Sequence, residues 1–167
     1  GHSGSGKTSL GEAMLFNCGS INRIGRVEDG NTVSDYDDEE IGRTMSLNLA
    51  AVPCEWEGHK INVLDAPGYA DFQGEMLNGL HVVDTAVLVL DGTSGVEVGT
   101  QITWQMAVGN NKPIAIFVNK MDRANAGFRR VIDQLRDSFE ATFVPMQVPI
   151  RNGEEFAGIV DLTTLRS

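Results

Sequence analysis

The chain has 167 residues, of which 41% are hydrophobic and 22% are charged, and this composition is typical of one globular domain with a buried core. It contains no run of about 18 apolar residues, which excludes a membrane-spanning helix from the sequence. The formal net charge of −10 argues against autonomous nucleic-acid binding, because phosphate binding requires clustered Lys and Arg.

A complete phosphate-binding loop, G-x-x-x-x-G-K-[ST], occupies residues 1–8. Backbone N–H groups of such a loop converge on phosphate oxygens, and its glycines let the backbone wrap closely. We expect Lys7 to reach the β- and γ-phosphates and the Thr8 hydroxyl to bind Mg²⁺. The loop therefore predicts a nucleoside triphosphate site. The expected nucleotide contacts in it are Gly1, His2, Ser3, Gly4, Ser5, Gly6, Lys7, Thr8 and Ser9.

Downstream of the loop, apolar residues at helical spacing predict a helix through residues 9–16. An acidic stretch follows at residues 28–40, and it can be interpreted as a solvated loop or as a mobile switch segment. Residues 46–56 alternate as a strand, with Leu47, Leu49 and Ala51 on one face. A turn at residues 57–60 then leads into a second strand at 61–64.

From residue 72 onward, helices and apolar strands alternate. The predicted elements are a helix at 72–83, a strand at 85–90, a helix at 96–108, a strand at 113–118 and a helix at 126–139. Uninterrupted apolar strands are typical of a parallel sheet covered on both faces. The pattern predicts a doubly wound α/β fold with a mostly parallel sheet and ligands at the carboxyl ends of its strands. Two short strands, 143–150 and 156–162, are predicted around a turn at 151–155.

Asp65-Ala66-Pro67-Gly68 directly follows a predicted strand. A carboxylate at this position can hold Mg²⁺ through a water molecule, and the Gly68 N–H can contact a γ-phosphate. The D-x-x-G pattern alone indicates an ordinary turn, but its place after a complete phosphate loop favours the nucleotide role.

Asn119-Lys120-Met121-Asp122 follows the strand predicted at 113–118. The Asp122 carboxylate can accept from N1–H and the exocyclic amine of guanine, whereas adenine would leave it unpaired. Asn119 can brace the phosphate loop and the Lys120 stem can cover the purine face. This motif predicts selection of GTP over ATP and argues against an ATP-dependent enzyme.

Together these motifs resemble the GTPase domain of translational GTPases, most closely elongation factor G and its paralogues. The resemblance also covers residues 65–72, 117–123, and 144–150 leading into 158–162. It implies a P-loop NTPase fold of the Ras-like G-domain type, GTP hydrolysis with Mg²⁺, GTP and GDP as nucleotides, the ribosome as partner, and a cytoplasmic monomer. Residues 1–142 would be the G-domain core, incomplete at both ends, and 143–167 the start of the inserted G′ subdomain. Such a fragment is expected to be marginally stable alone and to bind nucleotide weakly.

The resemblance also assigns roles around the phosphates. Ser46 takes the place of the switch I threonine whose hydroxyl binds Mg²⁺, so that Thr8, Ser46 and Asp65 become the expected metal ligands. Lys7, Gly68 and Tyr69 become the expected catalytic residues.

Tyr69 stands where family members usually carry the histidine that orients the attacking water. A phenol can orient water but cannot easily become a cation, so slow hydrolysis is expected. Ser3 and Gly4 also depart from the family pattern. The alternatives to a translocation-type factor are a ribosome-protection or release-factor GTPase, or a GTP-binding switch module with weak hydrolysis.

Three remaining groups are interpreted more simply. Cys18 and Cys54 have no metal-ligand spacing and are expected to be reduced structural thiols. Trp104 is expected to pack in the core, and Arg129 and Arg130 to decorate an exposed helix.

Overall fold

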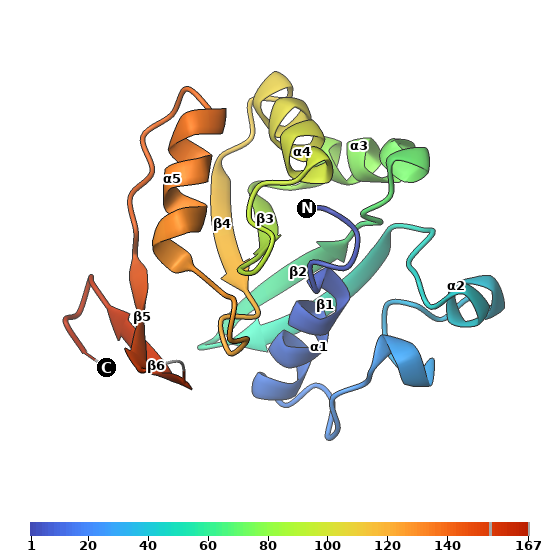
Figure 1. Cartoon of the computed structure of the whole chain (residues 1–167). Helices are drawn as coiled ribbons and strands as arrows, with labels where there is room; N and C mark the ends of the chain where they lie inside the picture. Colours follow the sequence, from blue (N-terminus) through green and yellow to red (C-terminus); the bar gives the residue numbers. More distant parts are fainter. Residues whose placement is uncertain (154, 167) are drawn as a thin grey trace.

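The structure, a computed structural model, describes residues 1–153 and 155–166. Helices and strands alternate in the middle of the chain, between residues 73 and 152 (Figure 1). In chain order the elements are α1 (Lys7–Asn17), η1 (Val27–Asp29), α2 (Asp38–Arg43), β1 (Ala50–Trp56), β2 (His59–Asp65), η2 (Ala70–Phe72), α3 (Gln73–Val82), β3 (Ala86–Asp91), α4 (Val98–Gly109), β4 (Ile114–Asn119), α5 (Phe128–Ser138), β5 (Gln147–Asn152) and β6 (Glu155–Asp161). Within the described ranges, no helix is long and apolar enough to cross a membrane.

The strands pair differently from the single, mostly parallel sheet expected from the sequence. In the described part of the chain they form three two-stranded ladders: β1–β2, β3–β4 and β5–β6. Only β3–β4 is parallel; the other two are antiparallel. The connections explain the difference, because a tight turn can join only antiparallel strands, whereas α4 provides the long crossover that a parallel pair needs.

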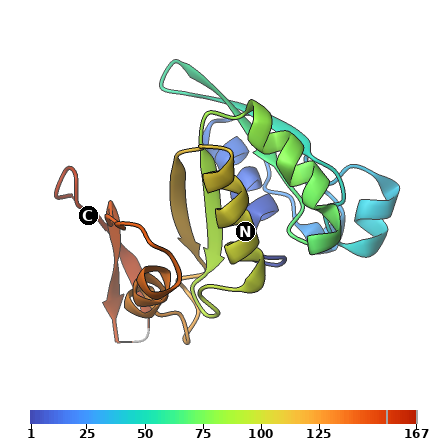
Figure 2. The same cartoon turned by 90° about the horizontal axis from the view of Figure 1, so that it is seen from above.

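The larger core lies on one face of the β3–β4 ladder, which Figure 2 shows from above. Leu88 and Leu90 of β3 pack there against Ala107 of α4 and against Val131 and Leu135 of α5. All five side chains are almost completely buried. This contiguous cluster fixes the carboxyl ends of β3 and β4 next to each other.

The opposite face of this ladder is covered only in part, whereas the sequence predicted that both faces are covered. Val87 is 53% exposed and Phe117 is 40% exposed, although Val89 on the same face of β3 is 3% exposed. The physical reason is where α1 packs: its Leu15 contacts Val52 and Cys54 of β1 and not the β3–β4 ladder.

The buried face of strand β1 also differs from the apolar face that the sequence predicted. It begins at Ala50, and it buries Ala50, Val52 and Cys54 while Ala51 is exposed. Successive residues of a strand point to opposite faces, so a shift of one residue exchanges the buried and exposed sets. Leu47 and Leu49 precede the strand and are half-buried.

Both predicted turns are shorter in the structure. The β1–β2 turn contains only Glu57 and Gly58, and both have left-handed backbone angles, with φ of 49° and 78°. His59 already pairs with Trp56 in the ladder. In the tail, residues 151, 152 and 155 belong to strands β5 and β6, while residue 154 lies outside the described residues.

The acidic segment at residues 28–40 is more buried than a solvated loop. Asp35 is 4% exposed and Glu40 is 1% exposed. Glu40 accepts hydrogen bonds from the backbone N–H groups of Leu47 and Asn48, both at 2.9 Å. A buried carboxylate is tolerated where such donors satisfy it. The solvated-loop interpretation is therefore wrong for these two side chains.

The aromatic residues confirm the packing role predicted for Trp104. Its ring stacks on Phe139 with centroids 4.4 Å apart and lies 5.6 Å from Phe143. These contacts tie α4, the end of α5 and the start of the tail together. Cys18 and Cys54 are both free thiols, as the sequence predicted.

Candidate nucleotide site

Residues 1–6 form a loop that leads directly into α1. Gly6 precedes the helix with φ of 91°, and Gly4 has φ of 73°. A Cβ on Gly6 would lie 2.3 Å from the Asn119 amide nitrogen. This position therefore requires glycine twice over, for its backbone angle and for the close approach of β4.

The Lys7 side chain folds back over this loop. Its Nζ donates to the carbonyl oxygens of His2 at 3.0 Å and of Gly1 at 3.3 Å. Burial lowers the pKa of Lys7, and the charges of Asp65 and Asp35 oppose that shift. Gly68 of the second motif approaches the same place, because a Cβ on it would lie 2.3 Å from Lys7 Nζ. The first two motifs thus meet at one lysine.

The three residues predicted to ligate Mg²⁺ come together in the structure. Thr8 Oγ1 donates to Asp65 Oδ2 at 2.7 Å, and the hydroxyl oxygens of Thr8 and Ser46 lie 3.2 Å apart. The ligands that Mg²⁺ prefers are oxygens of this kind, so these residues fit the ion chemically.

Two neighbours of this cluster were not identified from the sequence. Ser34 Oγ donates to Asp65 Oδ2 at 3.0 Å. Asp35 is buried, and its Oδ2 has no hydrogen-bond partner among the residues described. Burial raises the pKa of Asp35, and the negative charge of Asp65 adds to that shift. A divalent cation would compensate this pair of carboxylates. The only signal in the sequence was the acidic stretch itself, which does not single out one carboxylate.

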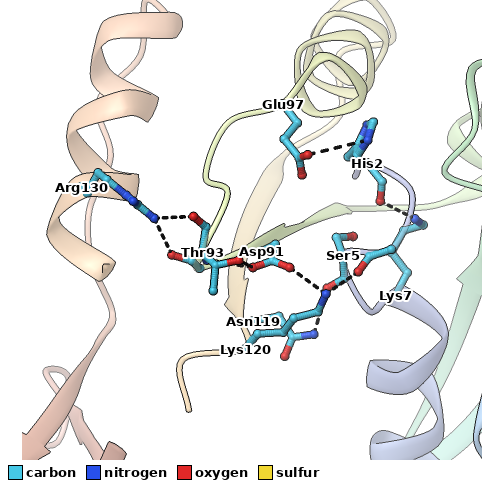
Figure 3. Close-up of polar contacts among 11 residues, drawn as sticks. His2, Ser5, Lys7, Asp91, Thr93, Glu97, Asn119, Lys120 and Arg130 are labelled. Carbon is cyan, nitrogen blue, oxygen red and sulfur yellow. Dashed lines mark hydrogen bonds and ion pairs between the residues drawn. The ribbon is translucent and has the colours of Figure 1, made fainter. Parts of the chain in front are cut away.

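The guanine motif, residues 119–122, reaches the phosphate loop from the end of β4 (Figure 3). Asn119 Nδ2 donates to the carbonyl of Ser5 at 2.9 Å, and Lys120 Nζ donates to the carbonyl of Gly4 at 2.6 Å. Asp122 is exposed and lines, together with Asn119 and Lys120, a cavity of about 720 Å³. The guanine motif and the phosphate loop are therefore joined by direct contacts.

Tyr69 lies at a second cavity, of about 510 Å³, between the phosphate loop, residues 67–70 and the start of α4. Its side chain is 45% exposed. His2 lines the same cavity, and its Nε2 lies 3.7 Å from Glu97 Oε1. Ser9, the last predicted contact, is exposed in the first turn of α1.

Two arginines brace the loops around the guanine motif. Arg130 is exposed on α5, as expected, and in addition donates to the carbonyls of Thr93 at 2.6 Å and Gly92 at 3.2 Å. Arg151 of β5 donates to the carbonyls of Met121 at 2.8 Å and Arg123 at 3.0 Å. Contacts to backbone carbonyls leave no pattern in the partner side chains, so sequence reasoning missed both.

A phosphate loop, a hydroxyl–carboxylate cluster and a guanine motif that contact one another define the class of P-loop guanine-nucleotide-binding domains. The family model described as "Elongation factor Tu GTP binding domain" matches residues 1–162. The chain therefore belongs to this family, as the sequence predicted.

Comparisons with individual proteins support the same family. The chain is 39% identical over 166 residues to elongation factor G of Granulibacter bethesdensis, covering 99% of this chain and 24% of that protein. It is 43% identical over 164 residues to the mitochondrial ribosome-releasing factor 2 of Drosophila ananassae, covering 98% of this chain and 22% of that protein. A crystal structure of a Thermus thermophilus protein superposes with a TM-score of 0.91 at 34% identity, covering 96% of this chain and 24% of that one. The chain thus spans about a quarter of the length of these proteins.

Proposed function

We propose that this chain is the GTP-binding and GTP-hydrolysing domain of an elongation factor G-like translation factor that acts on the ribosome as a translocation-type switch. The contacts of Asn119 and Lys120 with the phosphate loop carry the proposal, because they support guanine recognition beside the phosphate cradle. The relatives named elongation factor G and ribosome-releasing factor support the ribosome as partner.

In the proposed reaction, the chain's residues bind and orient the nucleotide. Loop N–H groups and the Lys7 ammonium stabilise the negative charge that develops on the β- and γ-phosphates. Thr8 and Ser46, with Asp65 acting through water, would hold Mg²⁺, which when bound neutralises phosphate charge. Gly68, next to Lys7, offers its N–H to the γ-phosphate. Tyr69 orients the attacking water.

The proposal is tested with the full-length protein by competition binding and single-turnover hydrolysis. We expect unlabelled GTP, and not ATP, to displace a fluorescent GDP analogue. We expect slow GTP hydrolysis alone and faster hydrolysis with ribosomes. Equal competition by ATP, or hydrolysis that ribosomes leave unchanged, would contradict the proposal.

The Tyr69 side chain is expected to limit the hydrolysis rate. Tyr69→His should raise the ribosome-stimulated single-turnover rate by about 10- to 100-fold, because an imidazole near neutral pKa can both orient water and carry positive charge. Tyr69→Phe should lower the rate below that of the unmodified protein, because it removes the hydroxyl. GDP affinity, measured in parallel, should stay unchanged in both variants. Equal rates for all three proteins would refute this role.

A further inference from the structure

A carboxylate outside the three nucleotide motifs lies directly beside the guanine motif. Asp91 is the last residue of β3, is 7% exposed, and pairs across the ladder with Asn119, the last residue of β4. Its Oδ2 lies 2.7 Å from Lys120 Nζ. Because the same ammonium donates to the carbonyl of Gly4 at 2.6 Å, the head of Lys120 is held between the phosphate loop and β3 (Figure 3).

The other oxygen of Asp91 is also fixed. Oδ1 accepts from the Thr93 backbone N–H at 2.8 Å and from the Thr93 hydroxyl at 2.6 Å. Arg130 of α5 in turn holds the Thr93 carbonyl at 2.6 Å. The carboxylate cannot turn away from Lys120 without breaking these bonds, so α5 and the β3 loop together determine where it points.

The loop after β3 packs tightly on the guanine motif. The Gly92 N–H donates to the Asn119 carbonyl at 2.8 Å, and a Cβ on Gly92 would lie 2.8 Å from Met121 Sδ and 2.9 Å from that same carbonyl oxygen. The position therefore leaves no room for a larger residue. This close approach brings Asp91 within reach of a lysine that follows the neighbouring strand.

The charge on Asp91 is maintained across the physiological range. Burial opposes ionisation, but hydrogen bonds from Lys120 and Thr93 outweigh burial and lower the pKa of Asp91 to about 2. A charge-assisted hydrogen bond of this kind is stronger than a neutral one. Asp91 therefore keeps its negative charge in its 2.7 Å contact with Lys120 Nζ.

We propose that Asp91 is the positioning residue that holds Lys120 against the phosphate loop and thereby slows the release of bound guanine nucleotide. The inference rests on the proposed function and on the expectation from the sequence that the stem of Lys120 covers the purine. Lys120 has a left-handed backbone angle, with φ of 57°, and a long side chain with many rotamers. An ion pair that fixes this side chain before binding reduces the entropy lost when the base arrives.

The chain contains a matched aspartate that lacks the lysine. Asp161 at the end of β6 accepts through Oδ1 from the backbone N–H groups of Thr163 at 2.8 Å and Thr164 at 3.0 Å, and from the Thr163 hydroxyl. These hydrogen bonds, first that of the Thr163 hydroxyl, lower the pKa of Asp161 to about 2. No lysine pairs with it in residues 1–153 and 155–166. Asp161→Asn therefore controls for the loss of an aspartate turn alone.

The test is a double-mutant cycle in the full-length protein, read out as the dissociation rate of fluorescent GDP. Asp91→Asn should release GDP about tenfold faster than the unmodified protein. Lys120→Met should accelerate release further, and adding Asp91→Asn to it should change nothing more. Asp161→Asn should release GDP at the unmodified rate. Non-additivity is the decisive readout, because a purely structural effect of Asp91 would persist without Lys120.

Thr93→Val provides a milder variant if Asp91→Asn folds poorly, because it keeps the ion pair and removes one bond to Asp91. It should accelerate release only when Lys120 is present. Unchanged release from Asp91→Asn and Thr93→Val, or effects that add fully to that of Lys120→Met, would overturn the inference while leaving the proposed function intact. Failure of the unmodified protein to bind GDP would overturn both.

Discussion

Lys7→Met is expected to weaken the binding of GTP and GDP by about 100- to 1,000-fold. The Lys7 ammonium lies in the phosphate loop, bonded to the carbonyls of Gly1 and His2. Truncating one partner of a buried charged contact, here the proposed contact of the ammonium with the phosphates, costs about 3–5 kcal/mol, and the lower part of this range corresponds to the expected loss. Equilibrium titration of the full-length protein with fluorescent GDP measures it. Lys60→Met changes an exposed lysine of β2; it serves as the control and should bind GDP as the unmodified protein does.

The melting temperature of Lys7→Met distinguishes a lost nucleotide contact from an unfolded protein. Because burial lowers the pKa of Lys7, the charged form is disfavoured in the folded protein relative to the unfolded chain. That cost is fully present below the lowered folded pKa and is relieved progressively as the pH rises from the folded pKa to the higher pKa of the unfolded chain. Removing the charge should therefore leave the melting temperature of the nucleotide-free protein equal or higher. Tight GDP binding by Lys7→Met, or a much lower melting temperature, would contradict the assignment.

Asp122→Asn is expected to exchange nucleotide specificity from guanine to xanthine. The carboxylate accepts from N1–H and the exocyclic amine of guanine, whereas an amide offers a donor to the oxygen that xanthine carries in place of that amine. A buried polar mismatch of this type discriminates by about 10⁴. Competition of GDP and xanthosine diphosphate for the variant measures the exchange.

The control for this exchange is Asp133→Asn, an aspartate on α5 whose side chain is 60% exposed and pairs only with Arg136 among the residues that the structure describes. Surface pairs contribute little, so its preference for guanine should be unchanged. If Asp122→Asn still preferred GDP by the margin of the unmodified protein, another residue would have to read the base.

The sequence identified the site residues that act through fixed motif spacing. Asn119 and Ser5 are 114 positions apart, yet their contact was predictable because each belongs to a motif with a known role. Asp91 and Arg151 were not predictable. Their partners include a lysine that follows a neighbouring strand and backbone carbonyls, and the contacts of both residues depend on how β3, β4 and the tail pack.

The same distinction applies to the fold. Most helices and strands were predictable because hydrophobic periodicity is a local property, whereas α2, at the end of the acidic stretch, was not predicted. The buried face of β1 was not, because it depends on the pairing register with β2 and on contact with α1. The burial of Asp35 and Glu40 was hidden for a similar reason: the backbone donors of Glu40 come from Leu47 and Asn48, beyond the acidic stretch.

The chain contains two tryptophans in different environments, so that their fluorescence reports on two different parts of the structure. Trp56 is 51% exposed at the β1–β2 turn, whereas Trp104 stacks on Phe139 beside Phe143. A dissolved collisional quencher such as iodide reaches the first indole more readily than the second. The emission that resists quenching therefore comes from Trp104, and its wavelength reports optically whether the chain after α5 stays docked.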